Sequence, residues 1–393
     1  MKDDLSGQKG GEATRLIHAG QGRGRKYRTV GPPIERGSTI LMADAASLYD
    51  DDLTTYGRAG LSVQATLSAA LAELEGAAKV RLFPSGLAAV AGAMLAVLKA
   101  GDDVLVCDTI YNPSRRFCEH VLKRFGVGVR YYPPRASAED LLALATPATR
   151  LMVIESPGSL TFEMQDAPAI ADLARSRGIL TLMDNTWAAG LCFKPLAHGV
   201  DISVQALTKY VGGHSDVFMG SAATARPDLA EALTSAIRDF GWSVAPDDAY
   251  QMLRGMRTLA TRMERHAASG LVVAKWLEQH AAVAKVLYPA LPGADDHDLW
   301  KRDYAGAAAV FSVVFKPCSD TAIAAFLDEL RIFQLGYSWG GFESLALNCD
   351  PQFSARQWPP KLAGPSVRLS IGLEDPADLI ADLEAGIAAM AGV

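Results

Sequence analysis

The sequence predicts an α/β protein with a large, mostly parallel sheet and a smaller C-terminal α+β domain. Strand and helix patterns alternate between about residue 60 and residue 255, and strands joined by helical crossovers form parallel sheets with helices on both faces. After Gly255 the pattern changes to one long amphipathic segment followed by short strands and helices. With 393 residues, of which 49% are hydrophobic, the chain can form two or three domains.

The elements of the large domain follow from the spacing of apolar residues. Helices are predicted at 63–75, 87–99, 113–124, 138–145 and 167–177, and strands at 103–108, 127–132, 150–156, 179–184 and 201–207. Ligands on such sheets bind at the carboxyl ends of the strands. Residues that follow these strands are therefore candidates for a site.

The segments on either side of this domain have other patterns. Residues 1–59 hold many turn residues and few regular patterns, so we expect an arm that needs another surface to fold on, with its first ten residues mobile. Residues 256–393 predict helices at 257–280, 320–330 and 376–390 and strands at 307–315 and 366–372. The predicted domains are an arm (1–59), an α/β domain (60–255) and an α+β domain (256–393).

Composition argues against several classes of function. The net charge of -6, with scattered Lys and Arg, gives no attraction to nucleic acid or anionic membrane. The most hydrophobic window, 86–101, is shorter than the ~20 residues of a membrane span, and the N-terminal segment resembles neither a signal nor a transit peptide. The five cysteines include no C-x-x-C pair, so we expect mostly buried, reduced thiols, no metal site and a cytoplasmic protein.

Two of the residues that follow predicted strands are charged. Asp184 ends a strand, where a carboxylate needs a cationic or hydrogen-bonding partner to stay ionised. Lys209 lies between the strand 201–207 and a pair of glycines, and because a lysine is costly to bury, this position suggests a use for its amine. The simpler interpretations are a helix N-cap for Asp184 and a surface lysine for Lys209.

A helix start and a tyrosine complete the set. Ser85 and Gly86 open a helix with no acidic side chain in its first turn, and such a helix start would suit a phosphate, although the pattern taken alone favours an ordinary capped helix. Tyr111 follows the strand 103–108 and is either a core aromatic or a ring stacked on a planar ligand. A phosphate site, an acid for a ring nitrogen, a stacking ring and an amine together match pyridoxal 5'-phosphate (PLP). Lys209 would then bind the PLP aldehyde covalently.

The segments around these residues resemble the Cys/Met-metabolism family of PLP-dependent enzymes, from "TRLIHAG" (14–20) to "VRLSIGLED" (367–375). The family's T-K-Y and G-H-S-D segment is matched by Thr208, Lys209 and residues 213–216, and its strand-end D-N-T by Asp184. The resemblance implies the PLP-dependent transferase-like fold (aspartate aminotransferase-like, fold type I). It also implies a homotetramer, a dimer of dimers with active sites shared across subunits.

The resemblance further implies which residues hold the cofactor. Tyr56 and Arg58, a Y-x-R pair from a neighbouring subunit, would bind the phosphate together with Thr208. The γ-type enzymes often have a serine two residues before this threonine, where this chain has Ala206, so one phosphate hydroxyl would be absent. The other implied cofactor-binding residues are Ser85, Gly86, Leu87, Tyr111, Asp184 and Lys209.

One stretch indicates a branch of the family. Residues 337–345, "YSWGGFESL", resemble the cystathionine β-lyase branch, whereas γ-type enzymes usually have E-S-L-G-G at 337–341. Arg368 matches the family's substrate-carboxylate arginine. The implied substrate-binding residues are Tyr56, Tyr111, Tyr337, Ser338, Trp339 and Arg368, and the implied catalytic residues are Lys209, Tyr111 and Asp184.

The expected activity is β-elimination from L-cystathionine or a related cysteine S-conjugate, with Lys209 removing the α-proton. The products would be homocysteine, pyruvate and ammonia, which places the enzyme in methionine biosynthesis. A γ-elimination or γ-replacement enzyme of the same family remains an alternative. A nucleotide-binding dehydrogenase is disfavoured because no G-x-G-x-x-G follows the first strand, and the intact Lys209, Asp184, Tyr111 and Arg368 argue against a non-catalytic scaffold.

Overall fold

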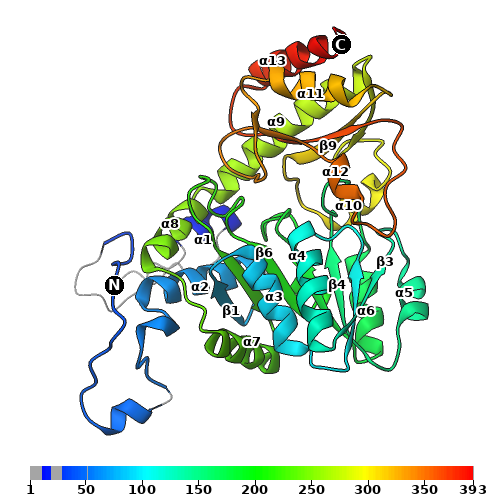
Figure 1. The fold of residues 1–393 in the computed structure, drawn as a ribbon. Coiled ribbons are helices and arrows are strands. Elements are labelled where there is room, and N and C mark those ends of the chain that lie inside the picture. The colour runs from blue at the N-terminus through cyan, green and yellow to red at the C-terminus, as the bar shows by residue number, and fades with distance from the viewer. Residues whose placement is uncertain (1–10, 19–28, 51, 393) are drawn as a thin grey trace.

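The computed structural model describes residues 11–18, 29–50 and 52–392 (Figure 1). They form a large α/β part on a seven-stranded sheet and a smaller α+β part on a five-stranded sheet. The predicted fold class is therefore confirmed. The mobility expected of the first ten residues, and the turn-rich stretch 20–27, lie outside the described residues.

The large sheet has the strand order β1-β7-β6-β5-β4-β2-β3. Its strands are β1 (Lys79–Phe83), β2 (Asp103–Cys107), β3 (Gly128–Tyr132), β4 (Thr149–Glu155), β5 (Leu180–Asp184), β6 (Ile202–Ala206) and β7 (Gly220–Thr224). Strand β7 is antiparallel to both of its neighbours, and the other adjacent pairs are parallel. The carboxyl ends of β2, β4, β5 and β6 therefore meet at one edge of the sheet.

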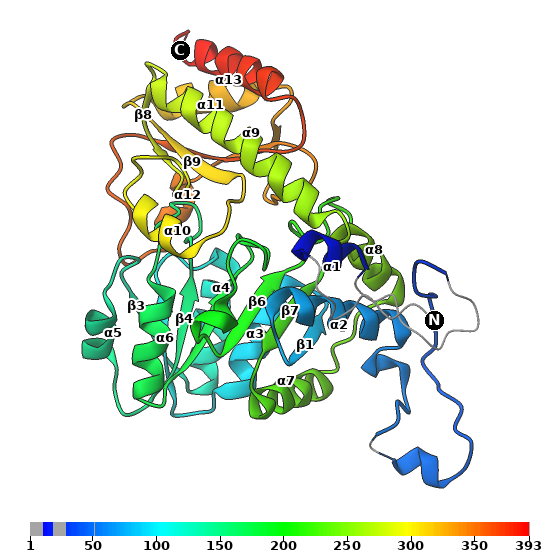
Figure 2. The ribbon, with the colours of Figure 1, turned by 180° about the vertical axis from the view of Figure 1, so that it is seen from behind.

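Helices cover both faces of this sheet (Figures 1 and 2). They are α2 (Ser62–Glu75), α3 (Gly86–Val97), α4 (Asn112–Phe117), α5 (Ala138–Leu144), α6 (Ala167–Ser176), α7 (Pro227–Phe240) and α8 (Pro246–Met256). Helix α3 packs against α4 and α7, and α5 packs against α6. The predicted helix 113–124 is not one α-helix, because α4 continues as a π-helical turn (Cys118–Leu122) and a 3-10 turn (Lys123–Phe125).

The smaller sheet has the order β10-β11-β12-β9-β8 and is antiparallel except for the pair β10 and β11. Its strands are β8 (Val283–Leu287), β9 (Val310–Phe315), β10 (Gln334–Leu335), β11 (Leu345–Asn348) and β12 (Ser366–Ser370). The helices of this part are α9 (Leu259–Gln279), α10 (His297–Asp303), α11 (Asp320–Glu329), α12 (Asp350–Phe353) and α13 (Pro376–Met390). Helix α9 follows α8 directly and so leads from the large part into the small one (Figure 1).

The N-terminal region folds only in part on its own chain. Helix α1 (Glu12–His18) buries Leu16, and the Lys194 amine donates to its first residue, Glu12, at 2.6 Å. The following described segment, up to residue 59, extends away from the body of the molecule (Figures 1 and 2). Its Leu41 is 91% exposed and its Tyr49 87% exposed. The domain boundaries after residues 59 and 255 stay predictions.

The described residues also bear on two other expectations. All five cysteines are free and four of them are buried, with Cys318 exposed, as the sequence predicts. No helix within the described ranges combines the length and hydropathy needed to cross a bilayer.

Candidate active site

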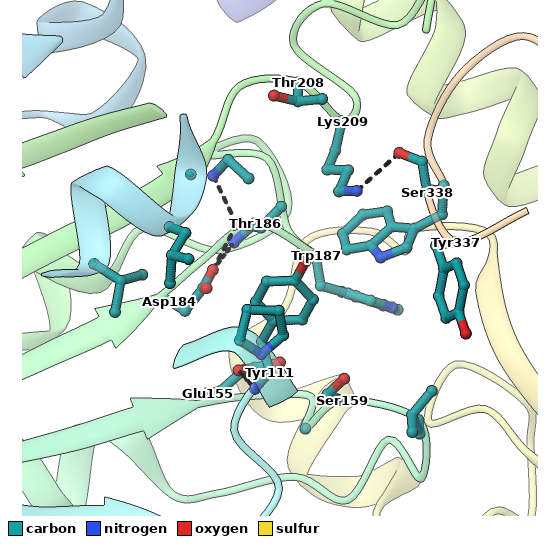
Figure 3. A pocket seen from close by; sticks show the side chains of 18 of the residues that line it. Tyr111, Glu155, Ser159, Asp184, Thr186, Trp187, Thr208, Lys209, Tyr337 and Ser338 are labelled. Carbon is teal, nitrogen blue, oxygen red and sulfur yellow. Dashed lines mark hydrogen bonds between the residues drawn. The ribbon is translucent and has the colours of Figure 1, made fainter. Parts of the chain in front are cut away.

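A cavity of about 410 Å³ lies at the carboxyl ends of the large sheet, where the small part closes over it (Figure 3). Residues of both parts line it. The predicted site residues in its wall are Ser85, Gly86, Leu87, Tyr111, Asp184, Thr208, Lys209, Tyr337, Ser338, Trp339 and Arg368. The fold thus brings together residues that are far apart in the sequence, including every predicted site residue except Tyr56 and Arg58.

Tyr56 and Arg58 lie outside this cavity. Tyr56 is 50% exposed and forms an isolated antiparallel bridge with Thr39. The Arg58 guanidinium donates to the carbonyl oxygen of Arg238, in the last turn of α7, at 3.1 Å. Within one chain, neither residue contributes to the site that its own Lys209 lines.

Lys209 directs its amine into the cavity. Its Nζ donates a hydrogen bond to Ser338 Oγ at 2.8 Å (Figure 3) and lies 5.3 Å from the centre of the Trp339 ring. Desolvation, and then the charge of Arg368, lower the pKa of Lys209 to about 8, although Asp184 acts in the opposite direction. An amine with this pKa is deprotonated in part near neutral pH, so it can act as a nucleophile or a base.

Asp184 is held by the threonine two residues after it. Its Oδ1 accepts hydrogen bonds from the Thr186 N–H at 3.0 Å and hydroxyl at 2.5 Å, and that hydroxyl accepts from the Ala206 N–H at 2.8 Å (Figure 3). Desolvation raises the pKa of Asp184 above its ordinary value. A cationic ligand atom beside this carboxylate would lower the pKa again and be bound strongly.

The first turn of α3 forms another wall of the cavity. Ser85 caps the helix, since its hydroxyl accepts from the Ala88 N–H at 3.1 Å, and the first turn holds no acidic residue. The N–H groups of Gly86 and Leu87 have no partner within the helix because they precede its first hydrogen-bonded turn. Gly86 packs against β6 so closely that a Cβ on it would lie 2.4 Å from Ala206 Cβ. This helix end therefore offers amide donors to an anion.

Thr208 is less available than the sequence suggests. Its hydroxyl donates to the carbonyl oxygen of Met219 at 3.2 Å and accepts from the Met219 N–H at 3.0 Å. To donate to a phosphate, this hydroxyl would have to release the Met219 carbonyl.

The guanidinium of Arg368 has one nitrogen, Nη2, that is hydrogen-bonded and another, Nε, that is not. Its Nη2 donates to the carbonyl oxygens of Tyr337 at 3.0 Å and Ser338 at 2.9 Å, while its Nε is buried without a hydrogen-bond partner among the described residues. Desolvation lowers the pKa of Arg368 to about 10, so it remains charged at neutral pH. A buried, unpaired N–H on a cation is the donor that a ligand carboxylate would satisfy.

These residues fit PLP. The cavity holds an amine for the aldehyde, a carboxylate for the ring nitrogen, an aromatic ring and a helix N-terminus for the phosphate. A bound, anionic ligand would also satisfy the unpaired Nε of Arg368.

The sequence patterns did not single out several lining residues. They include Glu155, Ser159, Thr186, Trp187 and Phe218. Glu155 ends a buried strand as Asp184 does, so the same argument could have identified it. Phe218, which is 76% exposed, carries no such signal.

The fold and the cavity define a PLP-dependent enzyme of the α/β type, and comparison with known proteins identifies its family. Residues 13–388 match the model of the Cys/Met metabolism PLP-dependent enzymes. The chain belongs to this family, and its cofactor is PLP.

Individual relatives are similar over nearly their full lengths. Cystathionine beta-lyase MetC of Escherichia coli K12 is 41% identical over 95% of this chain and 98% of its own. A Rhizobium johnstonii protein, which bears the name cystathionine beta-lyase provisionally, is 47% identical over the whole of both chains. A Wolbachia pipientis protein that is 39% identical over 96% of this chain and 97% of its own is named L-alanine/L-glutamate racemase.

A solved structure shows the same fold. The crystal structure of metB from Corynebacterium glutamicum has a TM-score of 0.90 and 29% sequence identity to this chain, covering 96% of this chain and 98% of its own. Because relatives with different activities share this family, the reaction itself must be argued from the site.

Proposed function

We propose that the chain is a carbon–sulfur β-lyase that converts L-cystathionine and water to homocysteine, pyruvate and ammonia. The observation that carries this proposal is the wall opposite the sheet, where Tyr337 and Trp339 flank Ser338, the hydrogen-bond partner of Lys209. The carboxylates among the described lining residues, Glu155 and Asp184, both lie on the sheet side of the cavity. A wall of this kind suits a thioether, and relatives named cystathionine beta-lyase support the same choice.

The residue roles follow from the geometry of the cavity. PLP, when bound, supplies an electron sink for the negative charge that develops at the substrate Cα. In our proposal, the Lys209 amine would hold the cofactor aldehyde and would be the base that removes the substrate α-proton. Asp184, oriented by Thr186, holds the positive charge on the ring nitrogen. Ser85, Gly86 and Leu87 would bind the phosphate, and Thr208 would join them by releasing the Met219 carbonyl.

Arg368 would fix the substrate. The unpaired Nε of Arg368 would bind the substrate carboxylate, while its Nη2 holds the backbone that carries Tyr337 and Ser338. Substrate binding and the position of the Lys209 partner, Ser338, are thereby coupled through one side chain.

A proton must reach the sulfur as the carbon–sulfur bond breaks. Lys209, carrying the α-proton, can deliver it, and Tyr111 can do so as well. Desolvation raises the pKa of Tyr111 above its ordinary value, so its hydroxyl keeps its proton at neutral pH. Both donors are consistent with our proposal.

We further propose that the working enzyme is a homotetramer, a dimer of dimers. Tyr56 and Arg58 lie outside the cavity of their own chain, in a segment with exposed apolar residues such as Leu41 and Tyr49. Transfer of this segment to a neighbouring subunit would bury these residues and bring the two phosphate ligands to the neighbour's cavity.

The alternative is γ-elimination or γ-replacement on the same scaffold, which is supported by a Mycobacterium bovis relative that is 36% identical over 98% of this chain and is named cystathionine gamma-synthase. The test is incubation of the purified, PLP-loaded protein with L-cystathionine and identification of the keto acid. Our proposal predicts pyruvate together with homocysteine. Formation of 2-oxobutyrate with cysteine would indicate γ-cleavage instead, and racemisation of L-alanine without either keto acid would assign the activity named for the Wolbachia relative. Lys209→Ala is the control, because it should abolish each activity.

A further inference from the structure

A carboxyl group outside the proposed catalytic set lies directly beneath Tyr111. Glu155 ends β4 and lines the cavity. Its Oε2 accepts a hydrogen bond from the backbone N–H of Tyr111 at 2.6 Å (Figure 3). The backbone carbonyl of Glu155 itself accepts from Gln165 Nε2 at 2.9 Å, so the strand end that carries the carboxyl group is fixed.

This hydrogen bond holds the residue whose ring faces the cavity. Tyr111 lies between β2 and α4, at the N-cap position of the helix, and 45% of its surface is exposed. Two residues earlier, the Thr109 carbonyl accepts from the Ser159 N–H at 2.8 Å. The hydrogen bond to Glu155 links the backbone N–H of Tyr111 directly to the end of β4.

Glu155 shares the cavity with the proposed ring-nitrogen partner. It is the register partner of Asp184 on the adjacent parallel strand, and side chains at paired positions of parallel strands project from the same face of a sheet. Two carboxylates in one desolvated cavity repel each other, so only one of them ionises readily. Asp184 accepts two hydrogen bonds from Thr186, whereas the described residues give the Glu155 carboxyl group one, from Tyr111.

The other charges around Glu155 do not make it ionise more readily than Asp184. The titratable groups that face it are those of Asp184 on β5, Cys107 on β2, Tyr111 and Arg356. Arg356 is the cation among them, and its guanidinium donates to Ser159 O at 2.5 Å and Thr161 Oγ1 at 2.8 Å. Desolvation, followed by the charge of Asp184, raises the pKa of Glu155 well above its ordinary value.

We propose that Glu155 is a positioning residue that holds the backbone of Tyr111 as an uncharged carboxylic acid. One carboxyl oxygen accepts the tyrosine N–H and the other carries the proton. The ring of Tyr111 is thereby kept over the cofactor site, and Asp184 is left as the ionised carboxylate that faces the ring nitrogen. This inference rests on the proposed roles of Tyr111 and Asp184 and is independent of the substrate.

The test compares Glu155→Gln with Glu155→Ala in the PLP-loaded protein. Glutamine keeps the acceptor oxygen and is uncharged, so the dissociation constant of PLP and the pH midpoint of the visible absorbance of the bound cofactor should match those of the wild type. Alanine removes the acceptor of the Tyr111 N–H, and the dissociation constant should rise about tenfold. Both measurements need only bound cofactor, so they remain informative if the substrate is not cystathionine.

A second background shows whether Glu155 acts through Tyr111. In a Tyr111→Ala protein, adding Glu155→Ala should change PLP binding by less than about twofold, because the side chain to be positioned is gone. Glu155→Asp withdraws the carboxyl group by one methylene and should resemble Glu155→Ala. This variant therefore tests the hydrogen bond to Tyr111 if the alanine variant fails to fold.

Three results would overturn the proposal. In the first, Glu155→Gln shifts the absorbance midpoint by a pH unit or weakens PLP as strongly as alanine does, so that the residue acts through its charge. In the second, Glu155→Ala binds PLP as the wild type does. In the third, its effect is undiminished in the Tyr111→Ala background, so that it acts on another part of the site.

Discussion

Lys209 destabilises the folded chain before any cofactor binds. The pKa of its amine falls from an ordinary value of 10.5 to about 8, because the folded chain desolvates it. Between these two values the unfolded chain binds more protons than the folded one, so the free energy of unfolding rises with pH in that window. Below pH 8 the full penalty applies, up to about 3 kcal/mol.

We therefore expect a Lys209→Met apoprotein to be more stable than the wild-type apoprotein at pH 7. Its advantage in melting temperature should shrink as the pH rises from about 8 to 10.5 and be lost above that range. Substitution of the exposed Lys275 on α9 by methionine is the matched control, since that lysine lies on the surface. An advantage that stays constant across this pH range would show that the penalty does not come from the charge of Lys209.

The residues of the site could be predicted where the residue type and its place after a strand are by themselves informative. Lys209 and Asp184 are charged groups next to apolar strands, and the structure places both in the cavity wall. Glu155 could have been identified as a candidate because it ends its strand as Asp184 does, but its proposed role depends on its register pairing with Asp184 and its contact with Tyr111. Neither relation is visible until the strand order is known. The commitment of the Thr208 hydroxyl to Met219 is hidden for the same reason.

At the scale of elements, the start of α3 depends on its contact with β6. Gly86 opens the helix, and a Cβ on it would lie 2.4 Å from Ala206 Cβ and 2.9 Å from Ala206 Cα. Any side chain at this position must push the helix end away from the sheet. The amide donors of Gly86 and Leu87 would move with it.

Gly86→Ala should therefore weaken PLP binding by about tenfold or more, which a fluorescence titration of the apoprotein with PLP would measure. Adding Ala206→Gly removes the methyl group that the new Cβ meets, so the double variant should recover part of the affinity. Full affinity in Gly86→Ala would mean that the helix start is not a phosphate site. If the double variant binds PLP no better than Gly86→Ala, the loss of affinity does not come from the contact between residues 86 and 206.

The helices and strands with a clear periodic pattern of apolar residues could be predicted from the sequence. The helix predicted at 376–390 coincides with α13, and the predicted strands of the large sheet overlap β2 to β6. Strand β7 was not predicted because its sequence, GSAAT, has small residues and no alternation, although all five residues are buried. Such a strand is specified by its neighbours β1 and β6.

At the scale of the whole molecule, the proposed site needs residues from two subunits. Lys209 lines the cavity of its own chain, whereas Arg58 lies on the outside, against α7. If Arg58 binds the cofactor of a neighbouring subunit, each site takes its Lys209 from one subunit and its Arg58 from the other. A variant that lacks Lys209 and a variant that lacks Arg58 can then complement each other in one mixed dimer.

Mixed oligomers test this sharing. Lys209→Ala alone should be inactive and Arg58→Met alone strongly impaired, yet refolding the two chains together at equal amounts should restore about a quarter of the wild-type activity. Half of random dimers are mixed, and one of their two sites is intact. The assay is keto-acid release from the mixture, with each variant refolded alone as the control. Activity no higher than the mean of the two controls would contradict sharing of Arg58 across subunits.

The covalent link between PLP and Lys209 is the most direct test of the proposed site. Reduction of the PLP-loaded protein with borohydride, followed by proteolysis and mass mapping, should place the pyridoxyl group on the peptide that contains Lys209 and on no other. A label on a different lysine, or none at all, would contradict the assignment of this cavity as the cofactor site.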